Sequence, residues 1–219
     1  MTETTSPSAA SGAAAFGLDA LDFAKQGGLL PTIVQDARTR RVLMLGYMDR
    51  AAVEATLASG KVTFFSRSKN RLWMKGETSG DVLEFVSIST DCDADALLVQ
   101  AVPQGPTCHL KRASCFAEAP GSVLAELEAT VTQRERERPA GSYTTTLFES
   151  GVRKIAQKVG EEGVETALAL VAQDDAAVLD EAADLAFHLL VGLRARGLSL
   201  ADVERVLAKR HQAKARVNA

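Results

Sequence analysis

The sequence has few cysteines, few aromatic side chains and no long apolar run. Its 219 residues include three cysteines, and aromatic residues make up 5% of the chain. An odd number of thiols, without the spacing of a secreted disulfide framework, favours a reducing compartment, in which three thiols indicate a metal ion or no special role. No apolar run approaches the roughly 18–20 residues that a membrane-spanning helix needs. We therefore expect no insertion into a membrane.

An excess of charge of either sign is also missing. The chain has 25 Lys and Arg against 28 Asp and Glu, a net charge of −3, which argues against a protein built to neutralise nucleic-acid phosphates or to coat anionic lipid. The first residues contain no Lys or Arg before Lys25 and no apolar block, so they predict neither a secretory signal nor a transit peptide. We expect a cytoplasmic protein with a disordered tail over residues 1–16.

The pattern of residues changes near Pro120-Gly121, and this change predicts two domains. Over residues 17–119, short β-type runs at 32–35, 42–47, 61–66 and 82–90 predict strands, and helical spacing over 49–59 ends at Gly60. Residues 120–219 are rich in Ala, Leu and Glu and predict helices over 122–137, 144–149, 151–172, 175–196 and 200–214. Asp174 and Ser199 are candidate N-caps and Gly197 a candidate C-cap. The predicted fold is a β-rich α+β domain followed by an all-α helical bundle.

Three carboxylates alternate along one short segment of the first half, at Asp91, Asp93 and Asp95. On an extended backbone they share one face and repel one another, and a hard divalent cation such as Mg²⁺ relieves that repulsion. Cys92 then points to the other face. The alternative is a solvated strand end that holds no metal.

The three thiols, Cys92, Cys108 and Cys115, suit a separate and softer site for Zn²⁺. Three protein ligands leave the fourth tetrahedral position for water, and zinc lowers the pKa of bound water to about 7. His109, next to Cys108, is placed to move a proton; alternatively it is a packed histidine or a fourth ligand. Because Cys92 need not meet the other two thiols within one chain, we expect a homodimer that completes the site. Buried thiols that only fill space are the simpler alternative.

Residues 66–80, between the strands predicted at 61–66 and 82–90, carry four cations, several hydroxyls and two glycines. Either this is an ordinary charged hairpin, or it binds phosphate through arginine forks and backbone N–H groups that glycine leaves accessible. The candidate substrate-binding residues are Arg67, Ser68, Arg71, Trp73, Lys75, Glu77 and Ser79.

The strings SRSKNRLWMKGETSG, DCDADALL and CHLKRASCF follow one another in this order. Together they resemble phosphoribosyl-AMP cyclohydrolase of histidine biosynthesis over about residues 25–116. The resemblance implies that the three Cys bind zinc, shared across a dimer, that the three Asp bind magnesium, and that the adenine ring is opened by hydrolysis between N1 and C6. The sequence departs from the family pattern at Lys69, where Arg is more usual, and at Leu110-Lys111, where Thr-Gly is more usual.

Carboxylates recur at helical spacing in the second half. Glu161 and Glu165 are four residues apart, Glu181 and Asp184 three apart, so each pair shares a helix face. Two acid pairs with lysines upstream predict a Mg²⁺ site for pyrophosphate chemistry; a solvated charged face is the alternative. The candidate ligands are Glu161, Glu162, Glu165, Glu181 and Asp184, and the candidate phosphate-binding lysines are Lys154 and Lys158. His188 is expected to be a packed helix residue outside the site.

The E-E-x-x-E and E-x-x-D patterns resemble the all-α, MazG-like nucleoside triphosphate pyrophosphatases. With RPAGSYT and QKVGEE, residues 122–212 are similar to phosphoribosyl-ATP pyrophosphohydrolase. The two resemblances imply a bifunctional hydrolase of small nucleotides. Its helical half releases pyrophosphate from phosphoribosyl-ATP, and its first half opens the ring of the resulting phosphoribosyl-AMP, the second and third steps of histidine biosynthesis. The rivals are a housekeeping nucleotide pyrophosphatase fused to a zinc deaminase-like domain, and a non-enzymatic, zinc-stabilised binding module.

Overall fold

The computed structural model describes residues 17–217, so the predicted tail over 1–16 lies outside the described residues. The chain divides into two compact units, with the boundary between Ser122 and Val123. Each unit has its own hydrophobic core. The boundary falls just after Pro120-Gly121, where the sequence pattern changes.

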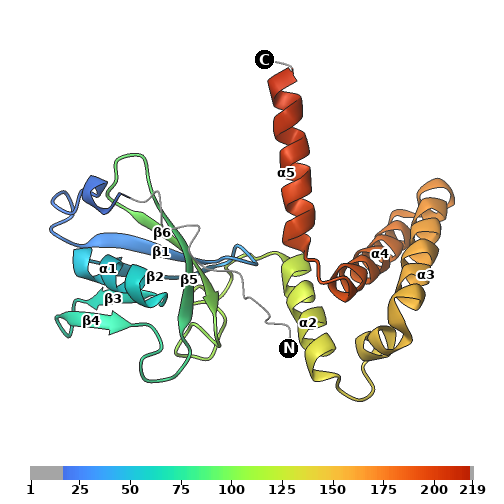
Figure 1. Cartoon of the computed structure of the whole chain (residues 1–219), viewed down its shortest axis with the longest axis horizontal. Coiled ribbons are helices and arrows are strands. Elements are labelled where there is room, and N and C mark those ends of the chain that lie inside the picture. The colour runs from blue at the N-terminus through green and yellow to red at the C-terminus, as the bar shows by residue number, and fades with distance from the viewer. Residues whose placement is uncertain (1–16, 218–219) are drawn as a thin grey trace, which may run out of the picture. The chain divides into compact units, whose positions relative to one another are not determined.

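The first unit is built on a four-stranded sheet with the strand order β2-β1-β6-β5 (Figure 1). Its strands are β1 (Leu30–Asp36), β2 (Val42–Met48), β5 (Leu83–Thr90) and β6 (Leu97–Pro103). β1 runs antiparallel to β2 and parallel to β6, and β5 runs antiparallel to β6. A 3₁₀ turn (Leu18–Ala20) precedes the sheet, and helix α1 (Arg50–Ser59) leads to a hairpin of β3 (Thr63–Ser66) and β4 (Arg71–Met74).

The four predicted strands and the first helix are confirmed, but β4 and β6 were missed. In β6, Leu97, Val99 and Ala101 are buried at period two, a strand pattern obscured by the acidic run before it and the proline at its end. Helix α1 ends at Gly60, as predicted, where φ is +68°, but it begins one residue later than predicted, because Asp49 is its N-cap and its Oδ1 accepts a hydrogen bond from the Ala52 N–H at 2.7 Å.

The core of the first unit lies between the sheet, α1 and the hairpin. Its fully buried side chains include Leu30, Val34, Val53, Phe64 and Leu83. Burial of each large apolar side chain stabilises the fold by about 1.5–3 kcal/mol. Phe64 also stacks on Trp73 across the hairpin, with ring centroids 5.8 Å apart. This contact therefore holds β4 against the core.

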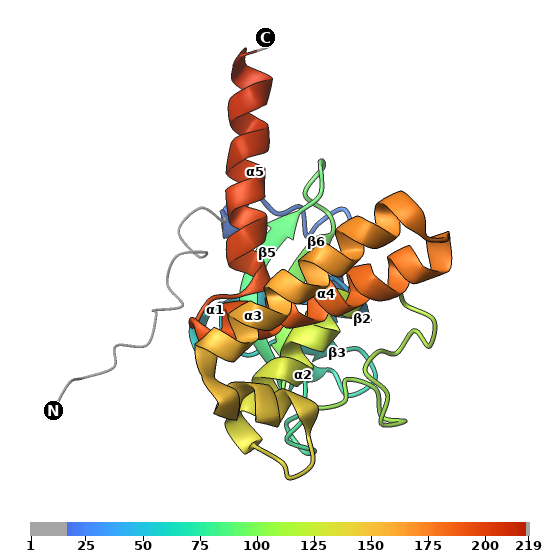
Figure 2. The same ribbon diagram turned by 90° about the vertical axis from the view of Figure 1, so that its right-hand side faces the viewer.

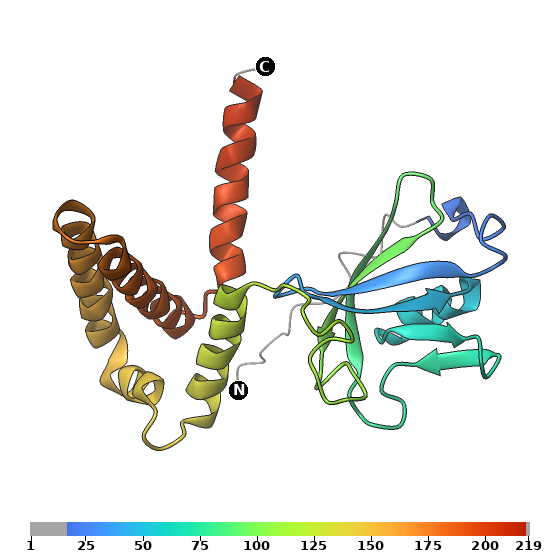
Figure 3. The ribbon, with the colours of Figure 1, turned by 180° about the vertical axis from the view of Figure 1, so that it is seen from behind.

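The second unit is helical throughout its regular structure. Its helices are α2 (Val123–Glu137), α3 (Tyr143–Ala172), α4 (Asp175–Ala195) and α5 (Leu200–Val217). Figures 2 and 3 show α3 and α4 side by side, joined by a short turn. The helices predicted over 144–149 and 151–172 are joined in α3 across a kink at Gly151, whose φ of +82° glycine adopts without strain.

The helix ends follow the predicted capping chemistry. The Asp174 carboxylate accepts a hydrogen bond from the Ala177 N–H at 3.0 Å. At the start of α5, Ser199 and Asp202 form a reciprocal capping box, which lowers the pKa of Asp202 to about 2 through hydrogen bonds from Ser199 and Arg205. None of the described helices is long and apolar enough to cross a membrane.

Candidate active sites

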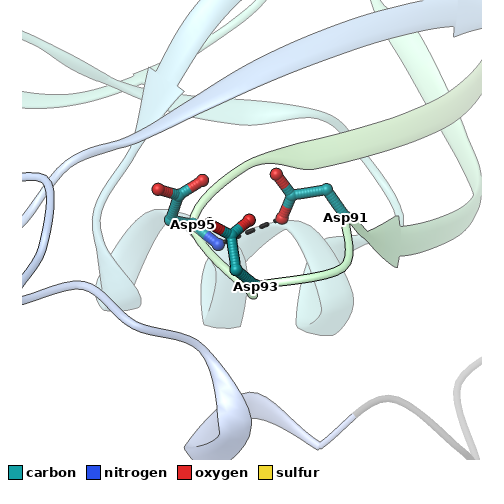
Figure 4. A group of neighbouring side chains, drawn as sticks. All are labelled: Asp91, Asp93 and Asp95. Atoms are coloured by element: carbon teal, nitrogen blue, oxygen red, sulfur yellow. Dashed lines mark hydrogen bonds between the residues drawn. The ribbon is translucent and has the colours of Figure 1, made fainter.

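The three aspartates lie in the turn between β5 and β6 and not on an extended strand (Figure 4). The expectation of alternating faces was therefore wrong. Asp91 Oδ1 accepts hydrogen bonds from the N–H groups of Asp95 and Ala96, both at 3.1 Å, and so closes a turn in which Ala94 has φ +60°. The turn still gathers the carboxylates, because one oxygen of each lies within 4.8 Å of the others.

A lysine from outside the turn neutralises part of this charge. The Lys25 ammonium contacts both Asp93 and Asp95, the latter at 2.7 Å, and Gln26 Nε2 donates to Asp95 at 3.1 Å. These hydrogen bonds raise the pKa of Lys25 and lower that of Asp95. The aspartate group is therefore an oxygen-rich site that already attracts a cation.

Two of the three cysteines lie on the long loop after β6, held against β2. The Cys115 N–H donates to the Leu43 carbonyl at 2.8 Å, and Ser114 Oγ donates to the Val42 carbonyl at 2.7 Å. A tight turn positions Cys108, whose carbonyl accepts the Lys111 N–H at 2.9 Å. Hydrogen bonding from the Leu110 N–H, followed by the effect of Arg112, lowers the pKa of the Cys108 thiol, whereas burial and the nearby Cys108 raise that of Cys115.

Cys92 lies apart from this pair within the described chain. Its Sγ is 4.0 Å from Asp93 Oδ1, in the aspartate turn. Among the described residues, the groups of three or more ligating side chains are one of aspartates and one of glutamates, and the three thiols do not form such a group. All three thiols are free. Because residues 91–96 form a turn, Cys92 does not lie on the opposite face of an extended strand, as was predicted, but it is still separate from the other two thiols.

A pocket of about 440 Å³ brings the predicted thiol and substrate segments together. Cys108, His109 and Cys115 line it from the loop after β6, and strand β4 together with the loop after it contributes four of the predicted substrate-binding residues. Gly76 allows the close packing of this second loop, because at its φ of +86° a Cβ would lie 2.5 Å from the Asp81 carbonyl oxygen. The four residues are Trp73, Lys75, Glu77 and Ser79.

Three other predicted substrate-binding residues do not line the pocket. Arg67 stacks on the Tyr47 ring, with its guanidinium carbon 3.9 Å from the ring centroid. Ser68 Oγ lies 3.5 Å from Ser66 Oγ, and Arg71 pairs with the Glu77 carboxylate, which lowers the pKa of Glu77. Of the lining residues outside the predicted set, two are charged, Asp81 and Lys111; neither belongs to a recognisable phosphate-binding pattern.

In the second unit, three acids gather between α3 and α4. Glu162, Glu165 and Glu181 each place an oxygen within 4.8 Å of the others. Glu162 is only 5% exposed, and Lys158 Nζ lies 2.7 Å from it and 2.9 Å from Glu161. Lys158 lowers the pKa of Glu162, whereas partial burial and the charges of Glu162 and Glu181 raise that of Glu165. Crowded acids of this kind favour a divalent cation.

The other predicted members of this site lie at its edge. Asp184 is exposed and is absent from the three-acid group, and Lys154 donates to Gln157 at 3.2 Å. His188 is the packed residue that was expected, 4% exposed, but its Nδ1 is 3.7 Å from Glu162 Oε1. Its Nε2 lies 3.1 Å from the Tyr143 hydroxyl. Its spacing of four residues after Asp184 was the available signal for a place beside the acids.

Comparison with known proteins agrees with the division of the chain into a sheet-containing unit and a helical unit. Residues 44–117 match the family model of phosphoribosyl-AMP cyclohydrolase, and residues 124–211 match that of phosphoribosyl-ATP pyrophosphohydrolase. The chain is 67% identical over 195 residues to a histidine biosynthesis bifunctional protein HisIE of Xanthomonas axonopodis pv. citri, covering 89% of this chain and 95% of that protein. It is 54% identical to the protein of the same name from Escherichia coli K12, covering 88% and 96%.

These matches correspond to two hydrolytic steps, release of pyrophosphate from phosphoribosyl-ATP and opening of the adenine ring of phosphoribosyl-AMP. The cyclohydrolase family is metal-dependent, and the described residues provide groups of carboxylates that can hold a cation. The chain belongs to the family of bifunctional histidine biosynthesis enzymes, with a cyclohydrolase domain followed by a pyrophosphohydrolase domain in one polypeptide.

Proposed function

We propose that the pocket of the first unit is the ring-opening site and that Cys108 and Cys115 hold Zn²⁺ there, together with a Cys92. The observation that carries this proposal is the pocket itself, which brings two thiols, His109 and the loop after β4 together. Sulfur donors suit zinc, and a three-thiolate zinc site would supply activated water. His109, exposed at the pocket, is positioned to move a proton during ring opening.

Binding of the substrate in this pocket falls to β4 and the loop after it. Lys75 and Ser79 offer donors to phosphate, and Trp73 offers an aromatic face to a base. Arg67, Ser68, Arg71 and Glu77 remain proposed contacts at the hairpin. Asp91, Asp93 and Asp95 would hold Mg²⁺, the hard cation that three carboxylate groups prefer, in competition with Lys25.

For pyrophosphate release, the proposed Mg²⁺ ligands are Glu162, Glu165 and Glu181, with Glu161 and Asp184 completing the set. Their convergence between two packed helices supports a MazG-like arrangement of the helical unit. Bound magnesium would supply positive charge that offsets the charge of the pyrophosphate group. Lys158 and Lys154 would then neutralise the remaining phosphate charge.

A homodimer would complete the zinc site, because Cys92 lies apart from the other two thiols within the described chain. The helical unit supports the same assembly, since it exposes several large apolar side chains. These include Val164, Leu168, Val171 and Leu179, and Val171 is 88% exposed. The three free thiols favour the cytoplasm, where thiols stay reduced.

Shared zinc sites predict complementation between two inactive chains. Cys92→Ala and Cys115→Ala should each abolish ring opening, because each removes one thiolate from every site. In a mixed dimer, one of the two sites regains a full set of ligands. We expect partial recovery of ring opening in verified mixed dimers, measured with phosphoribosyl-AMP. Verified mixed dimers without recovery would place all three ligands in one chain.

The ultraviolet spectrum of phosphoribosyl-ATP mixed with the protein tests both reactions together. Pyrophosphate release, assayed in parallel, should precede the spectral change of ring opening. A panel of free nucleoside triphosphates separates this activity from that of a housekeeping pyrophosphatase. Hydrolysis of the panel at rates equal to phosphoribosyl-ATP would contradict the assignment of the substrate.

A further inference from the structure

One side of the ring-opening pocket is organised around Asp81. Its backbone carbonyl accepts a hydrogen bond from Lys75 Nζ at 3.0 Å, and its carboxylate lies 3.3 Å from Lys111 Nζ. Gly76 and Gly105 leave room for Asp81, because a Cβ on either would lie 2.5 Å from an Asp81 atom. One residue therefore anchors two ammonium groups of the same pocket.

The two lysines differ in what they still offer to a ligand. Lys75 is 8% exposed and donates to a neutral carbonyl. The Lys111 side chain is 72% exposed, and its ammonium is paired with a partly buried carboxylate whose side chain is 20% exposed. An exposed lysine has two further N–H donors, so Lys111 can contact an anion without leaving Asp81.

Lys111 occupies a backbone conformation in its turn that residues other than glycine seldom adopt. Lys111 has φ +60°, in the left-handed region that glycine adopts without strain. The turn directs the side chain to the pocket that Cys108 and His109 also line. A residue with this conformation beside a reaction centre merits a functional test.

We propose that Lys111 binds a phosphate group of the substrate in the ring-opening pocket, and that Asp81 positions it. This inference rests on the proposed ring-opening site. Phosphoribosyl-AMP carries a phosphate at each end of the molecule, so its recognition requires cations at two places. Lys75 and Lys111 supply two ammonium groups held by Asp81, and the more exposed of the two, Lys111, contacts one of these phosphates.

The first test is Lys111→Met, assayed with phosphoribosyl-AMP. We expect KM to rise about 10-fold or more, as for loss of a charged hydrogen bond, while kcat and zinc content change little. Lys111→Arg keeps the charge and should restore KM. Lys61→Met is the matched control, because Lys61 is exposed and lies outside the pocket lining; its KM should equal that of the wild type.

A double variant separates phosphate binding from simple neutralisation of Asp81. Lys111→Met leaves the Asp81 carboxylate uncompensated, and Asp81→Asn removes that charge. If Lys111 contacts phosphate, the double variant should keep a KM several-fold above wild type. A wild-type KM in the double variant, or in Lys111→Met itself, would overturn the proposal. Absence of ring opening in the wild-type protein would instead contradict the underlying function.

Discussion

Replacing Cys108 by Ser should abolish ring opening and lower the zinc content of the protein. A hydroxyl is a much poorer zinc ligand than a thiolate, so the metal is lost or held without its proper geometry. We expect the rate of ring opening to fall roughly 100-fold or more, because a metal ion supplies several kcal/mol of transition-state stabilisation. The measurements are metal analysis and the spectral change of phosphoribosyl-AMP.

The second unit provides the control for this variant. Pyrophosphate release from phosphoribosyl-ATP should continue at the wild-type rate, since Cys108 lies in the first unit and the glutamates lie in the second. Unchanged zinc content together with unchanged ring opening in Cys108→Ser would contradict the assignment of Cys108 as a ligand.

Replacing Glu165 by Gln should impair pyrophosphate release and leave ring opening intact, the reverse of the effect expected for Cys108→Ser. Glu165 is one of the three gathered acids, and an amide is a weaker ligand for Mg²⁺ than a carboxylate. We expect pyrophosphate release to fall roughly 100-fold or more, while ring opening of supplied phosphoribosyl-AMP persists. The substitution keeps the size and helical propensity of the side chain, so the fold should survive.

Glu149→Gln is the matched control, because Glu149 is exposed on the same helix but is absent from the three-acid group. It should leave both activities unchanged. A parallel loss of both activities in a soluble, zinc-loaded Glu165→Gln protein would show that the units do not act separately.

Patterns local in sequence predicted most of the fold. The caps at Asp174 and Ser199 each depend on residues within a few positions of one another, so the sequence is enough to identify them. Strand β4 was missed because it begins with exposed residues, Arg71 and Leu72, and lacks a clear apolar face. Strand pairing is nonlocal, and its burial pattern becomes clear only in the folded sheet.

The difference between local and nonlocal contacts also explains which parts of the candidate sites could be predicted from the sequence. The gathering of Glu162 and Glu165 follows from helical spacing, but the contribution of Glu181 depends on how α4 packs against α3. The aspartates gather for a reason that differs from the predicted one, since a hydrogen-bonded turn replaces the extended strand. Asp81 reaches Lys111 across 30 residues, a contact for which the sequence carries no spacing signal.

The separation of the two reactions can be tested by mixing a Cys108→Ser protein with a Glu165→Gln protein and supplying phosphoribosyl-ATP. Alone, the first variant should release pyrophosphate and accumulate phosphoribosyl-AMP, and the second should do neither. The mixture should form the ring-opened product after a lag, because each protein retains the unit that the other lacks. Failure of the mixture to form this product, with each variant still active in its own remaining step, would contradict two independent active sites.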